Sequence, residues 1–160
     1  MSTREVSADE DPIIEGIEDL VAPMIAGEKP PERWRIGTEH EKLVYRQADH
    51  RAPAYDEPGG IRDLLLALRE FGWEPVEENG TVIAMRGADG TVSLEPAGQL
   101  ELSGAPLENL HQTCAETGRH LAQVKAVGER LGVGFLGLGM WPDKTRDALP
   151  IMPKGRYAIM

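Results

Sequence analysis

The residues best suited to chemistry in this sequence are carboxylates that recur at a spacing of two. Glu39 and Glu41 belong to one segment, and Glu101 lies between Gln99 and Ser103 in another. In a β-strand, side chains two residues apart point to the same face of the sheet. Clustered carboxylates repel one another unless a cation joins them, and oxygen ligands suit Mg²⁺. The spacing therefore allows a site for a divalent cation, with Glu39, Glu41 and Glu101 as candidate ligands.

Glu95 extends this pattern if the Pro-Ala-Gly break at residues 96–98 keeps its strand in phase. Four carboxylates on one face would then suit a magnesium-bound nucleoside triphosphate. The alternative is a strand face in contact with water, where glutamates need no function, because antiparallel sheets often have one solvated face. The residues alone leave both interpretations open.

The segments around these carboxylates predict an α+β fold, with an antiparallel sheet and flanking helices. Asn79-Gly80 and Asp89-Gly90 are typical of hairpin turns between short strands, and Gly72 and Gly132 are suited to end helices. The predicted strands cover residues 34–46, 73–77, 81–86, 91–95, 99–103 and 134–139, and the predicted helices cover residues 13–25, 61–71 and 107–131. Residues 1–12 are polar and are predicted to be a disordered N-terminus. Residues 13–160 are predicted to be one domain or a large part of one.

The long helix over 107–131 carries the only cysteine and two of the histidines. Cys114 falls on its apolar stripe, which predicts a buried and inert thiol. The other members of this stripe are Leu107, Leu110, Leu121, Val124 and Leu131. His111 and His120 lie nine positions apart and share no helix face well, so structural or surface roles are expected for both.

Charge and hydropathy narrow the class of protein. The formal net charge of −10 disfavours nucleic-acid binding, because the surface would repel phosphate backbones. No apolar stretch is long enough to cross a membrane, and the polar start carries no signal-peptide core. One cysteine permits no disulfide within the chain. A soluble cytoplasmic protein is the expectation.

Three blocks, in order along the chain, resemble the glutamate–cysteine ligases of the plant and proteobacterial type. They are GTEHEK at 37–42, LEPAGQLELSGAP at 94–106 and PIMPKGRY at 150–157, and the resemblance extends over residues 13–160. It implies a catalytic domain like that of glutamine synthetase. It also implies ATP-dependent joining of the γ-carboxylate of L-glutamate to the amine of L-cysteine through γ-glutamyl phosphate, the first step of glutathione biosynthesis, with Mg²⁺ as cofactor and ATP as co-substrate.

The resemblance also suggests residues for the substrates. Lys154 and Arg156 become candidates for anionic substrate or phosphate oxygens, and Gln99 for orienting a substrate or a metal ligand. The alternative for Lys154 and Arg156 is an exposed tail without function. The expected Pro-Gly-Gly is Pro-Ala-Gly at 96–98, which matters because alanine favours negative φ more strongly than glycine does.

Members of this family are much longer than 160 residues. The chain is therefore expected to be an N-terminal fragment with an incomplete catalytic domain, and to be inactive alone. Two alternatives remain: another γ-glutamyl amine ligase on the same fold, or a truncated, non-catalytic metal-binding remnant. The oligomeric state does not follow from the sequence.

Overall fold

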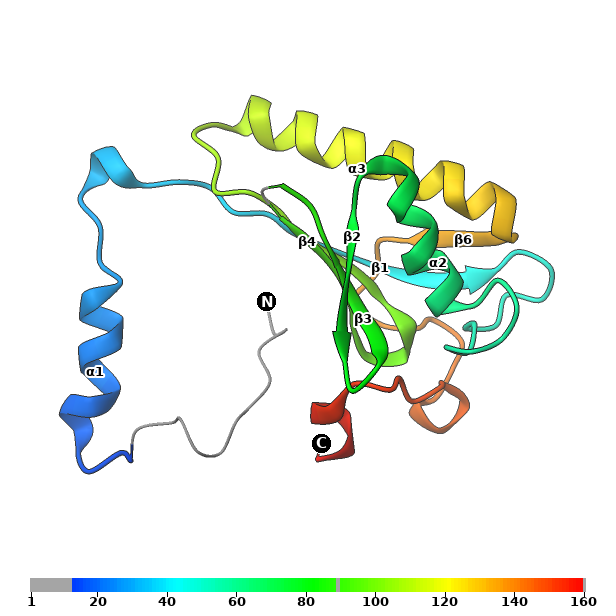
Figure 1. The fold of residues 1–160 in the computed structure, drawn as a ribbon, viewed down its shortest axis with the longest axis horizontal. Coiled ribbons are helices and arrows are strands. Elements are labelled where there is room, and N and C mark those ends of the chain that lie inside the picture. Colours follow the sequence, from blue (N-terminus) through cyan, green and yellow to red (C-terminus); the bar gives the residue numbers. More distant parts are fainter. Residues whose placement is uncertain (1–12, 89, 160) are drawn as a thin grey trace.

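A six-stranded sheet forms the centre of the protein, in a computed structural model that describes residues 13–88 and 90–159. The strands follow the order β2-β3-β4-β5-β1-β6, and each neighbouring pair is antiparallel (Figure 1). Their bounds are β1 Glu39–Arg46, β2 Glu74–Glu78, β3 Thr81–Arg86, β4 Thr91–Leu94, β5 Leu100–Ser103 and β6 Val133–Leu136. The predicted α+β fold with an antiparallel sheet is confirmed. The predicted disorder of 1–12 lies outside the described residues.

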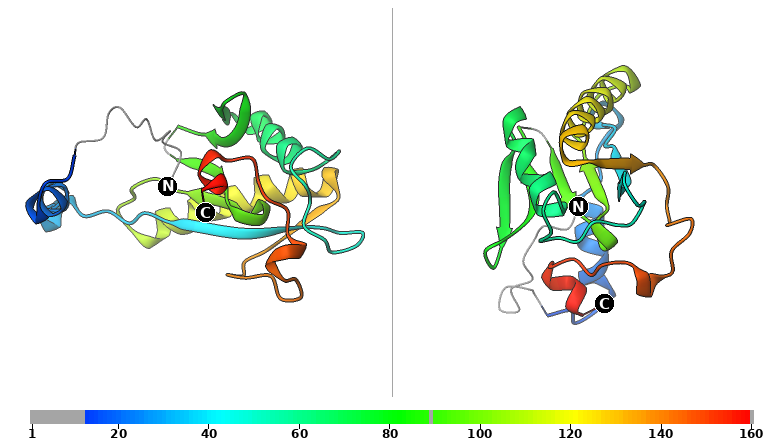
Figure 2. Two further views of the ribbon diagram at one scale, coloured as in Figure 1. Left: turned by 90° about the horizontal axis from the view of Figure 1, so that it is seen from below. Right: turned by 90° about the vertical axis from the view of Figure 1, so that its right-hand side faces the viewer.

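Two of the three α-helices in the described residues cover one face of the sheet. These are α2 (Ile61–Ala67) and α3 (Leu110–Leu131), and the segment after β6 runs along the opposite face (Figure 2). Helix α1 (Ile17–Ala26) stands apart from the sheet and buries none of its residues (Figure 1). None of the described helices combines the length and the hydropathy that crossing a bilayer requires.

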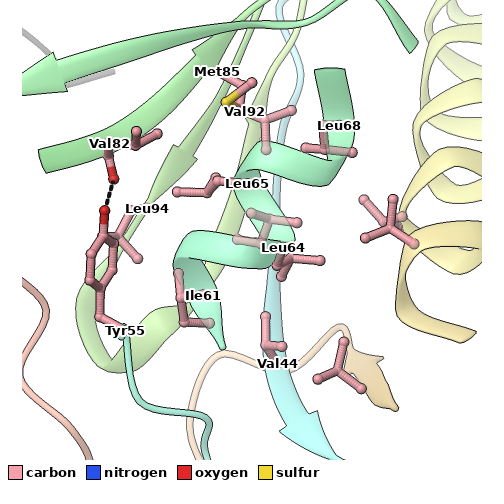
Figure 3. Packing of buried hydrophobic residues seen from close by; sticks show 14 of the residues in the cluster. Val44, Tyr55, Ile61, Leu64, Leu65, Leu68, Val82, Met85, Val92 and Leu94 are labelled. Atoms are coloured by element: carbon pink, nitrogen blue, oxygen red, sulfur yellow. Dashed lines mark hydrogen bonds between the residues drawn. The ribbon is translucent and has the colours of Figure 1, made fainter. Parts of the chain in front are cut away.

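The core lies between the sheet and helix α2. Ile61, Leu64 and Leu65 lie among the packed core side chains (Figure 3). Each of the three is at most 1% exposed. The hydroxyl of Tyr55 donates a hydrogen bond of 2.8 Å to the backbone carbonyl of Val82, which ties the preceding loop to β3. Each fully buried aliphatic side chain stabilises the folded state by about 1.5–3 kcal/mol. This packed layer therefore supports the sheet from one side.

The turns predicted from the sequence have the positive φ angles that their backbone conformations require. Asn79 and Gly80 both have positive φ, 51° and 77°, as a two-residue hairpin between β2 and β3 requires. Gly132 ends α3 with φ 67°. At the break between β4 and β5, Ala97 and Gly98 also have positive φ, 60° and 79°. Ala97 therefore adopts the left-handed conformation, which alanine disfavours.

We expect Ala97→Gly to stabilise the chain by roughly 1 kcal/mol, because a Cβ in the left-handed region is strained. The free energy of unfolding, measured by urea denaturation, checks this. Ala122→Gly on the exposed surface of α3 is the matched control, and helix propensity predicts a loss of about 1 kcal/mol there. Equal losses in the two variants would contradict the strain at Ala97.

Several predicted helix features are wrong. Helix α3 begins at Leu110 and not at 107, because the side chain of Asn109 caps it by accepting from the backbone N–H of Gln112. Helix α1 begins at Ile17 and not at 13. Cys114 is exposed and not buried.

The reason for the error at Cys114 lies in where α3 contacts the sheet. The buried residues of this helix all lie from its middle onward: His120, Val124, Val127 and Gly128. Leu110 and Leu121 are 67% and 42% exposed, so the predicted apolar stripe is displaced from the true buried face. The packing of α3 on β6, rather than its own periodicity, selects the side that is covered.

Candidate active site

The strand register brings the predicted carboxylates onto one face of the sheet. Glu41 on β1 lies opposite Glu101 on β5, and Glu39 lies opposite Ser103. On the next strand Ser93 pairs with Glu101, so Ser93, Glu101 and Glu41 form a row across β4, β5 and β1. Directly paired residues of antiparallel strands point to the same side. We call the surface formed by Glu39, Glu41 and Glu101 the carboxylate face.

The charges on this face act on one another. The pKa of Glu41 is raised above its ordinary value, first by partial burial and then by the neighbouring carboxylate of Glu101. Glu95 and Glu39 raise the pKa of Glu41 further, whereas the ammonium of Lys42 lowers it. Like charges held this close favour binding a cation, because the cation removes their repulsion.

Glu95 belongs to a different arrangement. It is 5% exposed, and its carboxylate accepts four hydrogen bonds. Ser93 Oγ and Lys154 Nζ lie 3.1 and 3.2 Å from Oε1, while Arg156 Nη2 and the Tyr157 hydroxyl lie 2.7 and 3.0 Å from Oε2. Burial by itself would raise the pKa of Glu95, but Lys154 above all, with Tyr157 and Arg156, holds it below the ordinary value.

These contacts connect residues for which the sequence predicted two different roles. Glu95 was predicted as a metal ligand, and Lys154 and Arg156 as substrate ligands, yet they bind one another. Lys154 is 3% exposed and also donates to the Leu94 carbonyl at 2.9 Å, so an exposed tail is wrong for this residue. The side chain of Arg156 remains 37% exposed and is therefore the more available cation.

A pocket of about 520 Å³ opens beside the contacts of Glu95, and Tyr157 belongs to both. Leu43 and Gln99 contribute to it from the sheet, and Trp141, Met152 and Tyr157 contribute from the segment after β6. The Oε1 atom of Gln99 is buried and has no hydrogen-bond partner among the described residues. The volume falls within the range of small-molecule sites, which are mostly apolar with a few polar groups. The predicted substrate residue Gln99 thus lies where an organic ligand would fit.

The donor set fits Mg²⁺ in chemistry and in part in geometry. Glu41 and Glu101 offer carboxylate oxygens from directly paired positions. Within the described ranges, however, no group of three or more His, Cys, Asp or Glu side chains is placed to hold an ion. Mg²⁺ in nucleotide sites is often bound by one or two carboxylates, with water and phosphate oxygens completing the octahedron. The pair therefore suits a magnesium–nucleotide complex better than a closed protein cage.

A second polar cluster lies on the helix side of the sheet. Lys42 on β1 and His120 on α3 are each only 2% exposed. Neither ring nitrogen of His120 has a hydrogen-bond partner within the part of the chain that the structure describes. Burial, followed by Lys42 and His40, lowers the pKa of His120 to about 3. The sequence could have indicated this burial, because position 120 lies on the same side of the helix as Val124 and Val127.

His120 gives the chain a pH-dependent stability with a definite sign. Its folded pKa of about 3 lies below the unfolded value, so the unfolded state binds more protons between those two values. Stability is therefore complete above pH ~6.5 and falls by up to ~1.4 kcal/mol per pH unit as pH decreases toward 5. Lys42 and His40 are the charged or titratable groups that act on this ring.

Urea denaturation at pH 7 and at pH 5 measures this slope. We expect His120→Leu to remove most of the loss between the two values, since leucine has no proton to bind. His111→Leu, at an exposed position on the same helix, serves as the control and should keep the wild-type slope. An unchanged slope in His120→Leu would contradict the role of this histidine.

Comparison with known proteins shows the family of the chain. The sequence profile of glutamate-cysteine ligase family 2 (GCS2) matches residues 35–160. Glutamate–cysteine ligase A, chloroplastic, of Oryza sativa subsp. japonica is 55% identical over 144 residues, which cover 89% of this chain and 29% of that protein. The chloroplastic glutamate–cysteine ligase of Arabidopsis thaliana is 51% identical over 144 residues, which cover 89% of this chain and 27% of that protein. The chain belongs to glutamate-cysteine ligase family 2.

Two facts follow for the expectations from sequence. The chain spans less than a third of the length of the curated relatives it matches, at 27–29% of each of the eight. The predicted cytoplasmic location is contradicted, because the relatives from Oryza sativa and Arabidopsis thaliana are named as chloroplastic.

Proposed function

We propose that this chain is part of an ATP-dependent ligase that joins the γ-carboxylate of L-glutamate to the amine of L-cysteine, the first step of glutathione biosynthesis. The observation that carries the proposal is the pairing of Glu41 with Glu101 on the sheet, within a chain that belongs to glutamate-cysteine ligase family 2. The activity belongs to a protein of the relatives' length, since this chain spans 29% or less of each. The sheet would then be part of a catalytic domain like that of glutamine synthetase.

The proposed metal is Mg²⁺, bound together with ATP. Glu41 and Glu101 would hold it, with Glu39 at the end of the same face. The ion supplies charge neutralisation between the anionic glutamate and the triphosphate. Glu95 is assigned to orienting Lys154 and Arg156 in this proposal, because its four acceptor contacts are already used by protein donors.

The chemistry has two steps. A γ-carboxylate oxygen of glutamate attacks the γ-phosphorus of ATP, and ADP leaves with the electrons of the broken P–O bond. The amine of cysteine then attacks the acyl carbon of γ-glutamyl phosphate, phosphate leaves, and the amine loses a proton. Arg156 and Gln99, both beside the pocket, are suited to contact the anionic and polar groups of the substrates.

The test is an assay of the protein isolated from its natural source. We expect one ADP and one γ-glutamylcysteine per turnover with Mg²⁺, ATP, glutamate and cysteine. A panel of other amines discriminates the nearest alternative, because a faster reaction with another amine would identify another γ-glutamyl ligase. Absence of turnover, with divalent cation binding by the chain retained, would identify a non-catalytic remnant.

A further inference from the structure

Helix α1 carries an apolar surface that the rest of the described chain leaves uncovered. The helix stands apart from the sheet, and none of its residues is buried (Figure 1). Seven large apolar side chains on it or just before it are 41–85% exposed. We call them the α1 face: Ile13, Ile14, Ile17, Leu20, Val21, Met24 and Ile25. Exposed apolar residues are normally scattered singly, and a patch of this kind marks an interaction surface.

A helix as short as α1 also needs a partner to remain helical. Isolated helices shorter than about 12–15 residues are marginal in water, and α1 has 10 residues. Its local support is the carboxylate of Asp19, which accepts from the backbone N–H groups of Glu15 and Gly16 at 2.8 and 3.1 Å. Pro23 lies inside the helix and has no N–H to donate. Packing of the α1 face is therefore the main stabilisation open to this helix.

The charges around the α1 face restrict its partner. Residues 13–28 contain no Lys or Arg, and their carboxylates are Glu15, Glu18, Asp19 and Glu28. A second copy would bring two acidic helices together on chains of net charge −10, which repel one another. Helices that lie on membrane surfaces are rich in Lys and Arg on their polar side, unlike this segment. The partner that fits is an apolar protein groove with basic residues at its rim.

The relatives supply a protein segment that could form such a groove. Each match covers 89% of this chain, so it must begin within α1 or before it. The relatives therefore contain a counterpart of this segment. More than two thirds of the length of each relative lies outside the match.

We propose that the α1 face binds an apolar, basic-rimmed groove in the part of a longer ligase that lies outside this chain. The connection from α1 reaches the sheet at Ile36, whose backbone pairs with that of Leu107 through hydrogen bonds of 2.7 and 2.8 Å. This pairing holds the helix beyond the sheet, where a groove in another segment can receive it. The inference rests on the longer protein of the proposed function, but not on its chemistry.

Amide hydrogen exchange tests the proposal, because it measures the protection of α1 and not turnover. The amides of α1 should exchange at least 100-fold more slowly in the ligase isolated from its natural source than in this chain alone. Strand β3 pairs on both sides, so it is the internal control and should be protected in both proteins. Rates in α1 that agree within threefold between the two proteins would overturn the proposal. Protection of α1 in a protein that forms no γ-glutamylcysteine would count against the proposed reaction alone.

A double variant tests the face itself. Ile17→Gln with Met24→Gln keeps good helix formers while removing two apolar side chains, which are 65% and 77% exposed in this chain. In the longer ligase, the protection of α1 should fall at least tenfold. Leu110→Gln is the control, because Leu110 is 67% exposed at the start of α3, and it should leave the exchange of α1 within twofold of the wild type. Full protection of α1 in the double variant would contradict the proposal.

The same measurement detects the other two occupants. Protection of α1 that rises with protein concentration would identify a second copy as the partner. Protection on addition of vesicles of phosphatidylcholine and phosphatidylglycerol would identify a membrane surface. Either result, without protection in the dilute longer ligase, would replace the proposed groove.

Discussion

Glu41→Gln and Glu101→Gln are each expected to weaken Mn²⁺ binding to the chain by about 100-fold, because a neutral amide replaces one of two paired anionic ligands. Glu95 cannot substitute for either ligand, since Lys154 and Arg156 hold its carboxylate. In the ligase isolated from its natural source, the same changes should lower formation of γ-glutamylcysteine by about 100-fold or more.

Calorimetric or spectroscopic titration with Mn²⁺ measures the first effect, and product formation measures the second. Glu77→Gln is the matched control, because Glu77 is an exposed carboxylate on strand β2 of the same sheet. Its Mn²⁺ affinity should stay within about threefold of the wild type. Wild-type turnover at saturating Mg²⁺ in both Glu41→Gln and Glu101→Gln would refute the assignment of these residues as ligands.

Lys154→Met is expected to lower the free energy of unfolding by about 3 kcal/mol, because it leaves the buried carboxylate of Glu95 without one of its two cations. The side chains of Lys154 and Glu95 are only 2% and 7% exposed, so little solvent screening reduces this effect. Arg156 and Tyr157 stay in contact with the carboxylate, which places the expected loss at the low end of the range for broken buried pairs.

The coupling of the pair is measured by adding Glu95→Gln. The double variant should lose less stability than the sum of the two single variants, since neither charge is then left unpaired. Lys144→Met is the control: its pair with Asp143 is more exposed, so little or no change in the free energy of unfolding is expected. Strict additivity in the Glu95–Lys154 cycle would contradict the ion pair.

The same pair sets the acid limit of the protein. The pKa of Glu95 is lowered in the folded state, so the unfolded state binds the proton more readily. The stabilisation is present above the ordinary unfolded pKa of about 4.3 and is lost as pH falls through the lower folded value. His120 acts over a wider range, from pH ~6.5 down to its folded pKa of about 3, so the two contributions overlap below pH ~4.3 and only His120 acts above it.

Much of the local structure follows from the sequence. The hairpin at Asn79-Gly80, the end of α3 at Gly132 and the shared face of Glu39 and Glu41 all appear as predicted. Each depends on interactions within a few residues or on the two-residue period of a strand. Such features are set by backbone sterics and alternation, which the sequence carries directly.

Other features depend on which elements meet. The exposure of Cys114 and the burial of His120 follow from where α3 packs against the sheet. Helix periodicity alone grouped Cys114 with Val124, and of these two only Val124 is buried. The ion pair between Lys154 and Glu95 joins residues 59 positions apart, and no local sequence pattern predicts it.

The sequence by itself determined the antiparallel α+β fold, the carboxylates on a common strand face and the resemblance to glutamate–cysteine ligases, which family membership confirms. Only the tertiary structure decided that Glu41 faces Glu101, that Glu95 is enclosed by protein cations, and that Lys42 lies buried beneath the carboxylate face. The physical reason is that side-chain periodicity and turn formation depend on residues close together in the sequence. Charge pairing and burial, by contrast, depend on strand register and helix packing, which bring distant segments together.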